Sequence, residues 1–441
     1  MLMIIPAGAP GRTCGSIITV TIVLIGVMAL DVPQMIPLIC RSKFLGLKHE
    51  STNVRPLRQA TEAYCLRVPR IRIRFPLSES ATELLPWFII FFPAFCDEDT
   101  MSWRRQLARL IPQASFVCST ALVVARRGAV VFMFHRVLEP GAVCYDAEMV
   151  TSTDLFGEFV QWLAREFEIV PLGEIAVRLQ NGRPLKRVCS LTFDDGWVDN
   201  YTNAFSIIRR FNAPATIFLA SSFIGSTRRL WQDRLWYLLR LISGTDLGDL
   251  VRNWRTQHQI EKAVPADLSF AAWRTFLMGV GNEEAEDFVV KLQDVVPRAA
   301  IPNAPVFMNW DQVREMHQAG IEFGAHTLNH VFLPNADVNT AQSEIEGSRR
   351  EIEERMNGRI AGFAYPWGAL NAKIRECVKR AGFKYAAGVQ PGIVRSKSDM
   401  FLLPRMFMSD SVLRYGSSFS KTNTAVYLAV KSITRAGANE Y

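Results

Sequence analysis

The chain has 441 residues, of which 49% are hydrophobic and 21% charged, so it has ample apolar content for a core, and we expect a folded rather than a disordered protein. The net charge of +8 is spread over many arginines rather than gathered in a basic block, so we predict no nucleic-acid binding and only a mild preference for anionic surfaces. The eight cysteines are scattered without a C-x-x-C pair, which argues against a zinc ribbon and against a disulfide scaffold.

Residues 1–100 are unlike the rest of the chain, and two interpretations of them stand. The apolar run at 16–30 is short for a spanning helix and resembles a signal-peptide core or a signal anchor, and the run at 84–96 is interrupted by prolines. This interpretation makes the protein exported or membrane-anchored, with membrane association through the N-terminal segment. In the other interpretation the natural chain starts near Met101, the upstream residues are extraneous, and the protein is cytoplasmic.

From residue 128 onward, short apolar runs typical of buried strands alternate with amphipathic helical stretches. We expect strands at 129–135, 187–193, 214–220, 321–326, 360–366, 385–389 and 401–406, and helices from an N-cap at Thr153, at 199–211, at 309–319 and at 343–356. This alternation predicts an α/β fold with a parallel sheet or barrel. Residues 228–305 interrupt it, and we interpret them as a helical insertion that covers one face, while 411–441 form a C-terminal tail.

Two adjacent carboxylates, Asp194 and Asp195, follow the second of these strands and directly precede Gly196. Neighbouring side chains on a strand point to opposite faces and like charges repel, so the pair is either a turn of no consequence or half of a metal site. Gly196 lets the backbone turn tightly, so that both carboxylates can face one cavity.

His326 and His330 are spaced i, i+4 directly after another predicted strand, and on a helical turn this spacing puts both imidazoles on one face. A catalytic zinc-like site needs a third protein ligand, and Asp194 or Asp195 is the natural candidate. The other carboxylate is then free to act as a base, and the cation offsets both charges. We expect a divalent metal, with zinc the best match to Asp/His/His ligands.

The stretches TFDDG (Thr192–Gly196), HTLNH (His326–His330) and FAYPWG (Phe363–Gly368) resemble successive motifs of the polysaccharide deacetylase family, carbohydrate esterase family 4. The resemblance covers roughly residues 128–410. It implies a distorted (β/α) barrel that holds one divalent metal, usually zinc. It also implies a chitooligosaccharide deacetylase-like hydrolase that acts on the carbon–nitrogen bond of N-acetyl groups in N-acetylhexosamine-containing oligo- or polysaccharides.

The resemblance implies roles for individual residues as well. The metal ligands would be Asp195, His326 and His330. Asp194 would be the general base that activates water at the metal. A backbone N–H near Trp367, next to Tyr365 and the turn at Pro366, would help hold the tetrahedral oxyanion or the substrate.

Two departures from the family pattern require substitutes. The arginine that steadies the catalytic aspartate is replaced by Ala364, and Arg405 is a candidate for its role, although a plain structural ion pair would also explain that residue. The family's late histidine, a general acid, has no counterpart because no histidine follows His330. His135, at the end of the first strand, is the substitute that we predict, since a histidine there can protonate a leaving amine near neutral pH.

Two alternatives stay open beside N-deacetylation of a glycan. The same metal and base would serve an esterase that removes O-acetyl groups. A catalytically inactive relative could use the same cleft only to bind carbohydrate. The intact aspartate and histidine pairs argue against it, while the missing motif arginine leaves room for it.

Overall fold

The computed structural model describes residues 126–433, except 297–300, 303 and 417. It also describes the backbone of two short strands, β1 (Ile22–Ile25) and β2 (Phe88–Phe91), which pair antiparallel. The rest of the signal-like run and the alternative start at Met101 lie outside the described residues. Within the described residues, no helix is both long and apolar enough to cross a bilayer.

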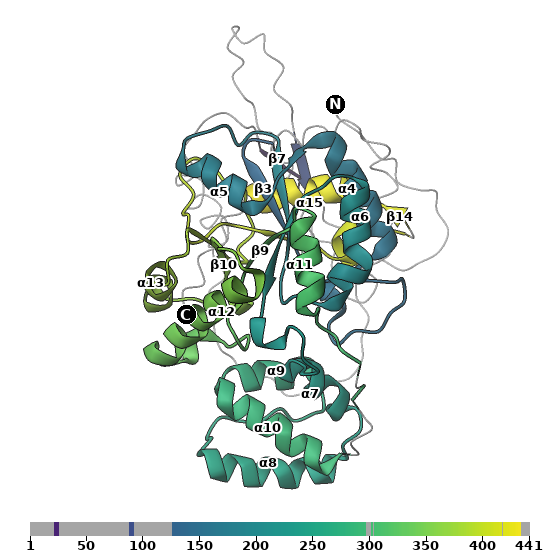
Figure 1. Cartoon of the computed structure of the whole chain (residues 1–441). Helices are drawn as coiled ribbons and strands as arrows, with labels where there is room; N and C mark the ends of the chain where they lie inside the picture. Colours follow the sequence, from purple (N-terminus) through teal and green to yellow (C-terminus); the bar gives the residue numbers. More distant parts are fainter. Residues whose placement is uncertain are drawn as a thin grey trace, which may run out of the picture. The chain divides into compact units, whose positions relative to one another are not determined.

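A curled, all-parallel sheet forms the centre of the fold (Figure 1). Its order is β11-β10-β9-β8-β7-β3-β12, and β6 pairs with β7 beside this path. The strands of this sheet are β3 (Ala129–Phe134), β6 (Glu168–Ile169), β7 (Val188–Phe193), β8 (Ala215–Leu219), β9 (Glu322–Ala325), β10 (Gly362–Ala364), β11 (Tyr385–Ala387) and β12 (Met406–Phe407). Every residue of β3 and β7 is buried, as expected for strands covered on both faces. The sheet and its helices form a half-barrel, which confirms the predicted (β/α) barrel-type fold.

Helices connect the strands and surround the sheet. They are α4 (Thr153–Glu166), α5 (Leu172–Gln180), α6 (Phe205–Arg210), α11 (Trp310–Gln318), α12 (Val338–Met356), α13 (Ala372–Arg380), α14 (Asp410–Leu413) and α15 (Lys421–Ile433). Helices α5, α13, α14 and α15 are not among the predicted helices. The N-cap position of α4 is Ser152, one residue before the predicted cap, and a π-helical turn, η3 (Asn200–Ala204), precedes α6.

Aromatic packing fixes α4 against the sheet. Phe132 and Phe134 on β3 meet Phe159 and Phe156 on α4 edge to face, with ring centroids 5.0 and 5.2 Å apart. These rings bury large apolar areas in the favoured T-shaped arrangement, so they stabilise the strand from which His135 follows. Two short pairings lie outside the main sheet: β4 (Arg136–Leu138) with β5 (Val150–Ser152), and β13 (Arg414–Tyr415) with β14 (Ser418–Phe419).

The segment at 403–407 links the two edges of the sheet. Leu403 forms a parallel bridge with Ala387 on β11, and three residues later Met406 pairs with Phe132 on β3. The backbone N–H of Leu403 donates to the carbonyl of Ala386 at 2.9 Å. Arg405 lies between these two pairings and is fully buried, so the closure of the sheet carries its side chain inward.

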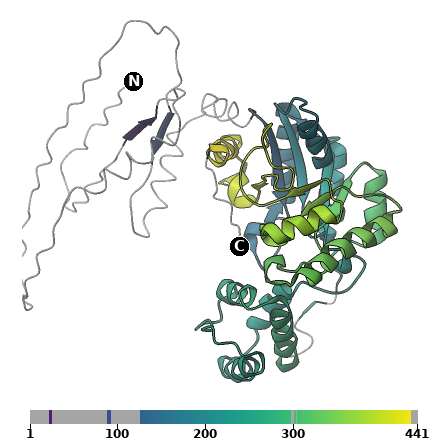
Figure 2. The ribbon, with the colours of Figure 1, turned by 90° about the vertical axis from the view of Figure 1, so that its left-hand side faces the viewer.

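Four helices between β8 and α11 form a group of their own at one end of the sheet (Figures 1 and 2). They are α7 (Trp231–Leu239), α8 (Gly244–His258), α9 (Phe270–Met278) and α10 (Asn282–Val295). Their buried side chains make a hydrophobic cluster separate from that of the sheet, and it contains Trp254 and Trp273. The Trp273 ring stacks on Phe288 with centroids 5.1 Å apart, so these aromatics form the core of the helix group. We call residues 228–305, which contain these four helices, the helical insertion.

Candidate active site and metal centre

The predicted site residues follow the C-terminal ends of neighbouring parallel strands. His135 follows β3, Asp194 and Asp195 follow β7, His326 follows β9, and Tyr365 follows β10. Because the carboxyl ends of parallel strands meet at one edge of a barrel, side chains from distant parts of the chain converge there. A cavity of about 700 Å³ opens at this edge.

Asp195, His326 and His330 form one buried cluster, with their ligand atoms all within 4.8 Å of one another. Oδ1 of Asp195 lies 3.5 Å from Nε2 of His326 and 3.3 Å from Nε2 of His330. Nδ1 of His326 is 2.7 Å from the Ala364 carbonyl, a contact that needs the proton on Nδ1 and leaves Nε2 free to ligate. Burial lowers the pKa of both histidines to about 4, so both imidazoles are neutral near pH 7.

This cluster has the chemistry of a metal centre. Oδ1 of Asp195 is buried, yet nothing in the described part of the chain donates a hydrogen bond to it. Two neutral imidazoles and one carboxylate are a ligand set that zinc accepts while keeping a position open. Tetrahedral ligands about 2.0–2.2 Å from zinc lie about 3.3–3.6 Å from one another, and the two distances from Asp195 to the histidines agree with this. The residues therefore fit a divalent cation.

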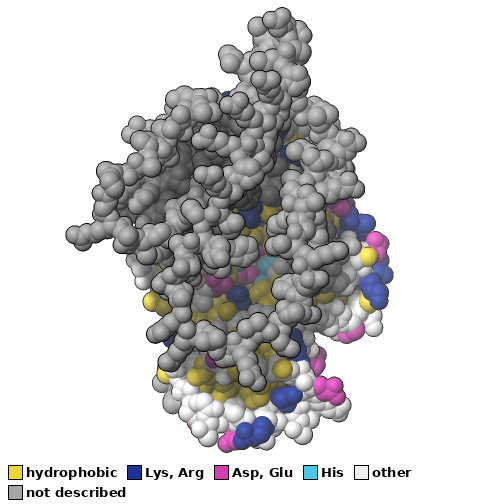
Figure 3. Space-filling view, turned by 180° about the vertical axis from the view of Figure 1, so that it is seen from behind, with side chains coloured by type: hydrophobic (Ala, Val, Ile, Leu, Met, Phe, Trp, Pro, Cys, Tyr) yellow, Lys and Arg dark blue, Asp and Glu magenta, His cyan; other side chains and the backbone are white. Residues whose placement is uncertain are grey.

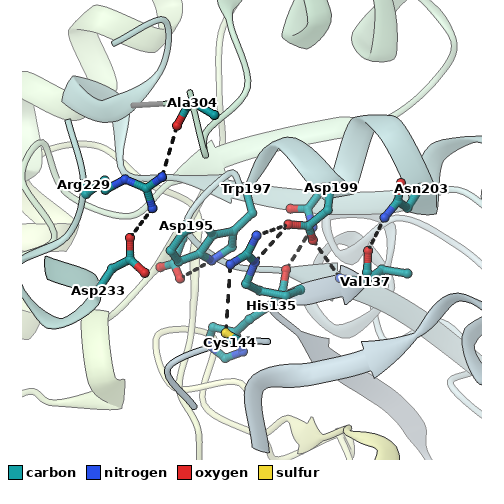
Figure 4. A network of polar contacts seen from close by, with 12 residues as sticks. His135, Val137, Cys144, Asp195, Trp197, Asp199, Asn203, Arg229, Asp233 and Ala304 are labelled. Carbon is teal, nitrogen blue, oxygen red and sulfur yellow. Dashed lines mark hydrogen bonds and ion pairs between the residues drawn. The ribbon is translucent and has the colours of Figure 1, made fainter. Parts of the chain in front are cut away.

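A chain of contacts fixes the orientation of Asp195 (Figure 4). Its second oxygen, Oδ2, accepts a hydrogen bond from the indole N–H of Trp197 at 2.8 Å. The Trp197 ring stacks on Phe307 at 4.6 Å between centroids and lies 4.4 Å from the Arg136 guanidinium. Arg136 is in turn paired with Asp199 at 2.8 Å. Trp197 is held on both sides, and Oδ1 of Asp195 is left facing the histidines.

Asp194 makes a different contact from its neighbour. Its two oxygens accept hydrogen bonds from Nη1 and Nη2 of Arg405 at 2.7 and 2.8 Å, and Nε of Arg405 donates to the Gly388 carbonyl at 2.7 Å. Burial alone would raise the pKa of Asp194, but the Arg405 guanidinium holds it well below its usual range. The structure thus brings Arg405 to the carboxylate that Ala364, a buried residue of β10, cannot reach.

His135 and Trp367 both line the cavity. Nδ1 of His135 is buried without a hydrogen-bond partner among the described residues, and its ring lies 5.7 Å from that of Phe407. The Trp367 ring lies 5.3 Å from that of His330. The backbone of Trp367 is in the left-handed region with φ 61°, a conformation that non-glycine residues adopt mainly where the surroundings enforce it, as at functional sites.

The structure does not bring Tyr365 or Pro366 to the cavity. Tyr365 is fully buried in the main hydrophobic cluster, and its hydroxyl donates to the Phe401 carbonyl at 3.0 Å. Pro366 is also buried and does not line the cavity. Both side chains therefore support the turn that presents Trp367, and a role for this turn at the oxyanion or the substrate stays a prediction.

Several cavity and supporting residues were not singled out from the sequence. Tyr145, Asp146, Gln232 and Arg274 line the cavity, and the last two come from the helical insertion. Figure 3 shows histidine and acidic side chains among hydrophobic ones on this face of the molecule. Trp197 could have been suspected, since it directly follows the TFDDG motif, whereas Gln232 carries no local signal in the sequence.

A buried Asp/His/His cluster beside an arginine-paired carboxylate, at the C-terminal edge of a parallel half-barrel, defines a candidate hydrolytic metal centre. The family model for polysaccharide deacetylases matches residues 181–266 and 275–386. This match confirms the resemblance of the chain's motifs to the polysaccharide deacetylase family. Asp194, Asp195, His326 and His330 lie within the matched residues, while His135 and Arg405 lie outside them.

Two curated relatives are similar to this chain over part of its length. A poly-beta-1,6-N-acetyl-D-glucosamine N-deacetylase of Staphylococcus epidermidis is 26% identical over 192 residues, which are 41% of this chain and 63% of that protein. YxkH of Bacillus subtilis is 19% identical over 240 residues, 54% of this chain and 57% of that protein. The chain thus spans less than two thirds of the length of both relatives.

Two solved structures are similar at low identity. The Streptococcus pyogenes deacetylase PplD, in complex with acetate, aligns with 68% of this chain and 97% of that chain, at 18% identity and a TM-score of 0.44. IcaB from Ammonifex degensii aligns with 69% of this chain and 97% of that chain, at 16% identity and a TM-score of 0.46.

Proposed function

We propose that the protein is a metal-dependent hydrolase that removes N-acetyl groups from an N-acetylhexosamine-containing oligo- or polysaccharide. The observation that carries this proposal is the division between two adjacent carboxylates, with Asp195 facing His326 and His330 and Asp194 paired with Arg405. The match to the polysaccharide deacetylase family model and the name of the Staphylococcus epidermidis relative support the N-acetyl glycan as substrate. Residues 128–410 are the proposed deacetylase domain.

Asp195, His326 and His330 are the proposed ligands of the divalent metal, and zinc is the metal that we propose. Such a cation would polarise the acetyl carbonyl and acidify a water molecule, which a base as weak as the arginine-paired Asp194 requires. Asp194 stays ionised because Arg405 stabilises its charge, so it can accept the proton of that water at neutral pH. Arg405 is the proposed positioning residue for Asp194.

The remaining steps concern the leaving group and the developing charge. The water oxygen bonds to the acetyl carbon, the amide C–N bond breaks, and the products are acetate and a free amine on the sugar. His135 lines the cavity and is the proposed donor of the proton that the amine nitrogen needs. The backbone N–H of Trp367 is the proposed donor to the tetrahedral oxyanion.

Acetate release from purified protein tests the proposal. Zinc-loaded protein is expected to release acetate from β-1,6- or β-1,4-linked N-acetylglucosamine oligomers, and metal removal by a chelator should abolish the release. Asp194→Asn is expected to lower kcat by about 10²–10⁴-fold, the range for a lost general base. Asp311→Asn, an exposed carboxylate on α11, is the matched control. Release only from O-acetylated glycans would make the protein an esterase, and binding without release would make it an inactive relative.

A further inference from the structure

The cavity extends beyond the metal centre onto the helical insertion, where it meets a glutamine with unsatisfied hydrogen-bonding groups. Gln232, in the first turn of α7, lines the cavity and is 1% exposed. Neither its Nε2 nor its Oε1 has a hydrogen-bond partner among the described residues. Buried amide groups are nearly always paired in proteins, because leaving them unpaired costs free energy. An amide with both a donor and an acceptor unused at a cavity wall is suited to a polar ligand.

Contacts of Arg229 with Asp233 and Ala304 fix the first turn of α7, which carries Gln232 (Figure 4). The next residue, Asp233, is buried and accepts a hydrogen bond from Arg229 at 2.5 Å. Arg229 also donates to the carbonyls of Pro302 and Ala304 at 3.0 and 3.2 Å. This arginine therefore ties the two ends of the helical insertion together and holds the first turn of α7 in place. The backbone that carries Gln232 is thus fixed at the cavity wall, and its side chain is buried there.

Tyr145 connects this wall of the cavity with the metal centre. Its ring lies 6.4 Å from that of Trp197, the residue that holds Asp195, and 5.8 Å from that of Phe270 in α9. Burial, with a further contribution from the Asp195 charge, raises the pKa of Tyr145 well above its usual value, so the hydroxyl keeps its proton. No hydrogen bond joins this hydroxyl to another described residue, and it can serve a ligand as a donor.

A charged pair forms another part of the same cavity wall. Nη1 of Arg274, on α9, contacts Oδ2 of Asp146 at 2.6 Å, and both side chains line the cavity and are about one quarter exposed. Because the two charges compensate each other, this part of the cavity favours an uncharged ligand with hydroxyl groups, which the guanidinium and the carboxylate can bind as donor and acceptor. Aromatic and aliphatic neighbours, Tyr145 and Leu230 among them, match the apolar faces of a sugar ring.

We propose that Gln232, Tyr145 and the Asp146–Arg274 pair form a subsite for an uncharged sugar unit that adjoins the unit being deacetylated. The substrate is then an oligo- or polysaccharide rather than a single sugar, and the helical insertion determines its recognition. This inference rests on the proposed function for the identity of the neighbouring unit. Gln232 and Arg274 are specificity-determining residues in this proposal, since neither belongs to the cluster that would bind the metal.

Length dependence of binding and turnover tests this subsite. Wild-type, zinc-loaded protein is titrated calorimetrically with N-acetylglucosamine and its β-1,6-linked dimer, trimer and tetramer, and KM and kcat are measured on the same series. Affinity is expected to rise from monomer to tetramer in the wild type. In Gln232→Leu and in Arg274→Met, this gain in affinity from monomer to tetramer should be about tenfold smaller, because one or two hydrogen bonds are lost. The change is expected in KM rather than in kcat.

Matched controls lie on α8 of the same insertion. Gln257 is an exposed glutamine, and Arg252 is an exposed arginine paired with Asp249, so Gln257→Leu and Arg252→Met repeat the chemical changes away from the cavity. Both controls are expected to keep the wild-type length dependence. Because the amide of Gln232 lacks partners, Gln232→Leu should keep or raise the melting temperature.

Unchanged length dependence in Gln232→Leu and Arg274→Met would overturn the subsite. A loss of affinity in Gln232→Leu together with a lower melting temperature would also overturn it, because Gln232 would then serve the packing of α7. The proposed function fails separately. If the wild type binds the tetramer through these residues but releases no acetate, the subsite stands and the deacetylase assignment fails. If the wild type and both variants release acetate with equal KM, the deacetylase assignment stands and the subsite fails.

Discussion

At the scale of single residues, the buried ion pair between Asp194 and Arg405 decides whether a carboxylate can stay charged beside the candidate metal ligands. Arg405→Lys keeps the positive charge but not the two parallel hydrogen bonds, so we expect kcat/KM to fall about 10–100-fold. Arg405→Met leaves a buried charge unpaired and should lower the free energy of unfolding by about 3–5 kcal/mol. Kinetics and urea unfolding measure the two effects.

Arg395→Lys is the matched control for this pair, because Arg395 is exposed on the same late part of the chain. It should leave kcat/KM and stability at wild-type values. Full activity in Arg405→Lys would show that charge alone suffices and that the forked geometry has no role in positioning Asp194.

The proposed role of His135 as general acid is based on its position at the cavity wall. We expect His135→Gln to lower kcat by about 10²–10⁴-fold, the range for one lost general acid. Zinc content, measured by atomic absorption, should stay at the wild-type level because His135 is not a proposed ligand. His317→Gln, at an exposed histidine of α11, is the control. Retention of wild-type kcat in His135→Gln would require another proton donor.

At the scale of elements, the turn after β7 holds Asp195 through Trp197. Trp197→Phe keeps the stacking surface against Phe307 but removes the indole N–H that binds Oδ2 of Asp195. Residues that orient a ligand typically affect metal affinity by 10–100-fold, so we expect the zinc Kd to rise by about that factor. Competition with a chromophoric chelator measures it. Trp236→Phe, on α7, is the control, and an unchanged Kd in Trp197→Phe would mean that the indole does not orient the carboxylate.

At the scale of the whole molecule, local patterns predicted a parallel sheet or barrel and most of the residues that converge at its edge. Asp194, Asp195, His326 and His330 could be found because their chemistry is visible within five-residue stretches that follow strands. The contact of Arg405 with Asp194 spans 211 residues and arises only when the segment at 403–407 links β11 to β3, so the sequence could offer it only as a candidate.

Two other features could not be predicted from local sequence patterns. Tyr365 follows a strand next to Trp367, yet its ring packs in the core, because the turn at 366–368 directs only Trp367 to the cavity. Gln232 resembles any polar residue of an amphipathic helix, and only the packing of the helical insertion against the sheet end buries it at the cavity. Residues that act through tertiary closure therefore needed the structure.

The buried histidine pair also predicts how the stability of the metal-free protein depends on pH. His326 and His330 have a pKa of about 4 in the folded chain, against 6.5 as the ordinary value. Between these two pH values the unfolded chain binds protons that the folded chain excludes. The free energy of unfolding therefore rises with pH from about 4 to 6.5, and the contribution of these histidines is lost as the pH falls through this window. Each histidine contributes at most about 1.4 kcal/mol per pH unit.

Urea unfolding of chelator-treated protein at several pH values across this window measures that slope. The double variant His326→Gln, His330→Gln should have a smaller slope than the wild type, because it lacks the two excluded protons, whereas His258→Gln at the partly exposed His258 should keep the wild-type slope. Zinc should steepen the wild-type dependence, since protons compete with the metal for both imidazoles in the folded chain. Equal slopes in the wild type and the double variant would mean that these histidines bind protons as readily in the folded chain as in the unfolded one, and burial would then not keep them neutral for metal binding.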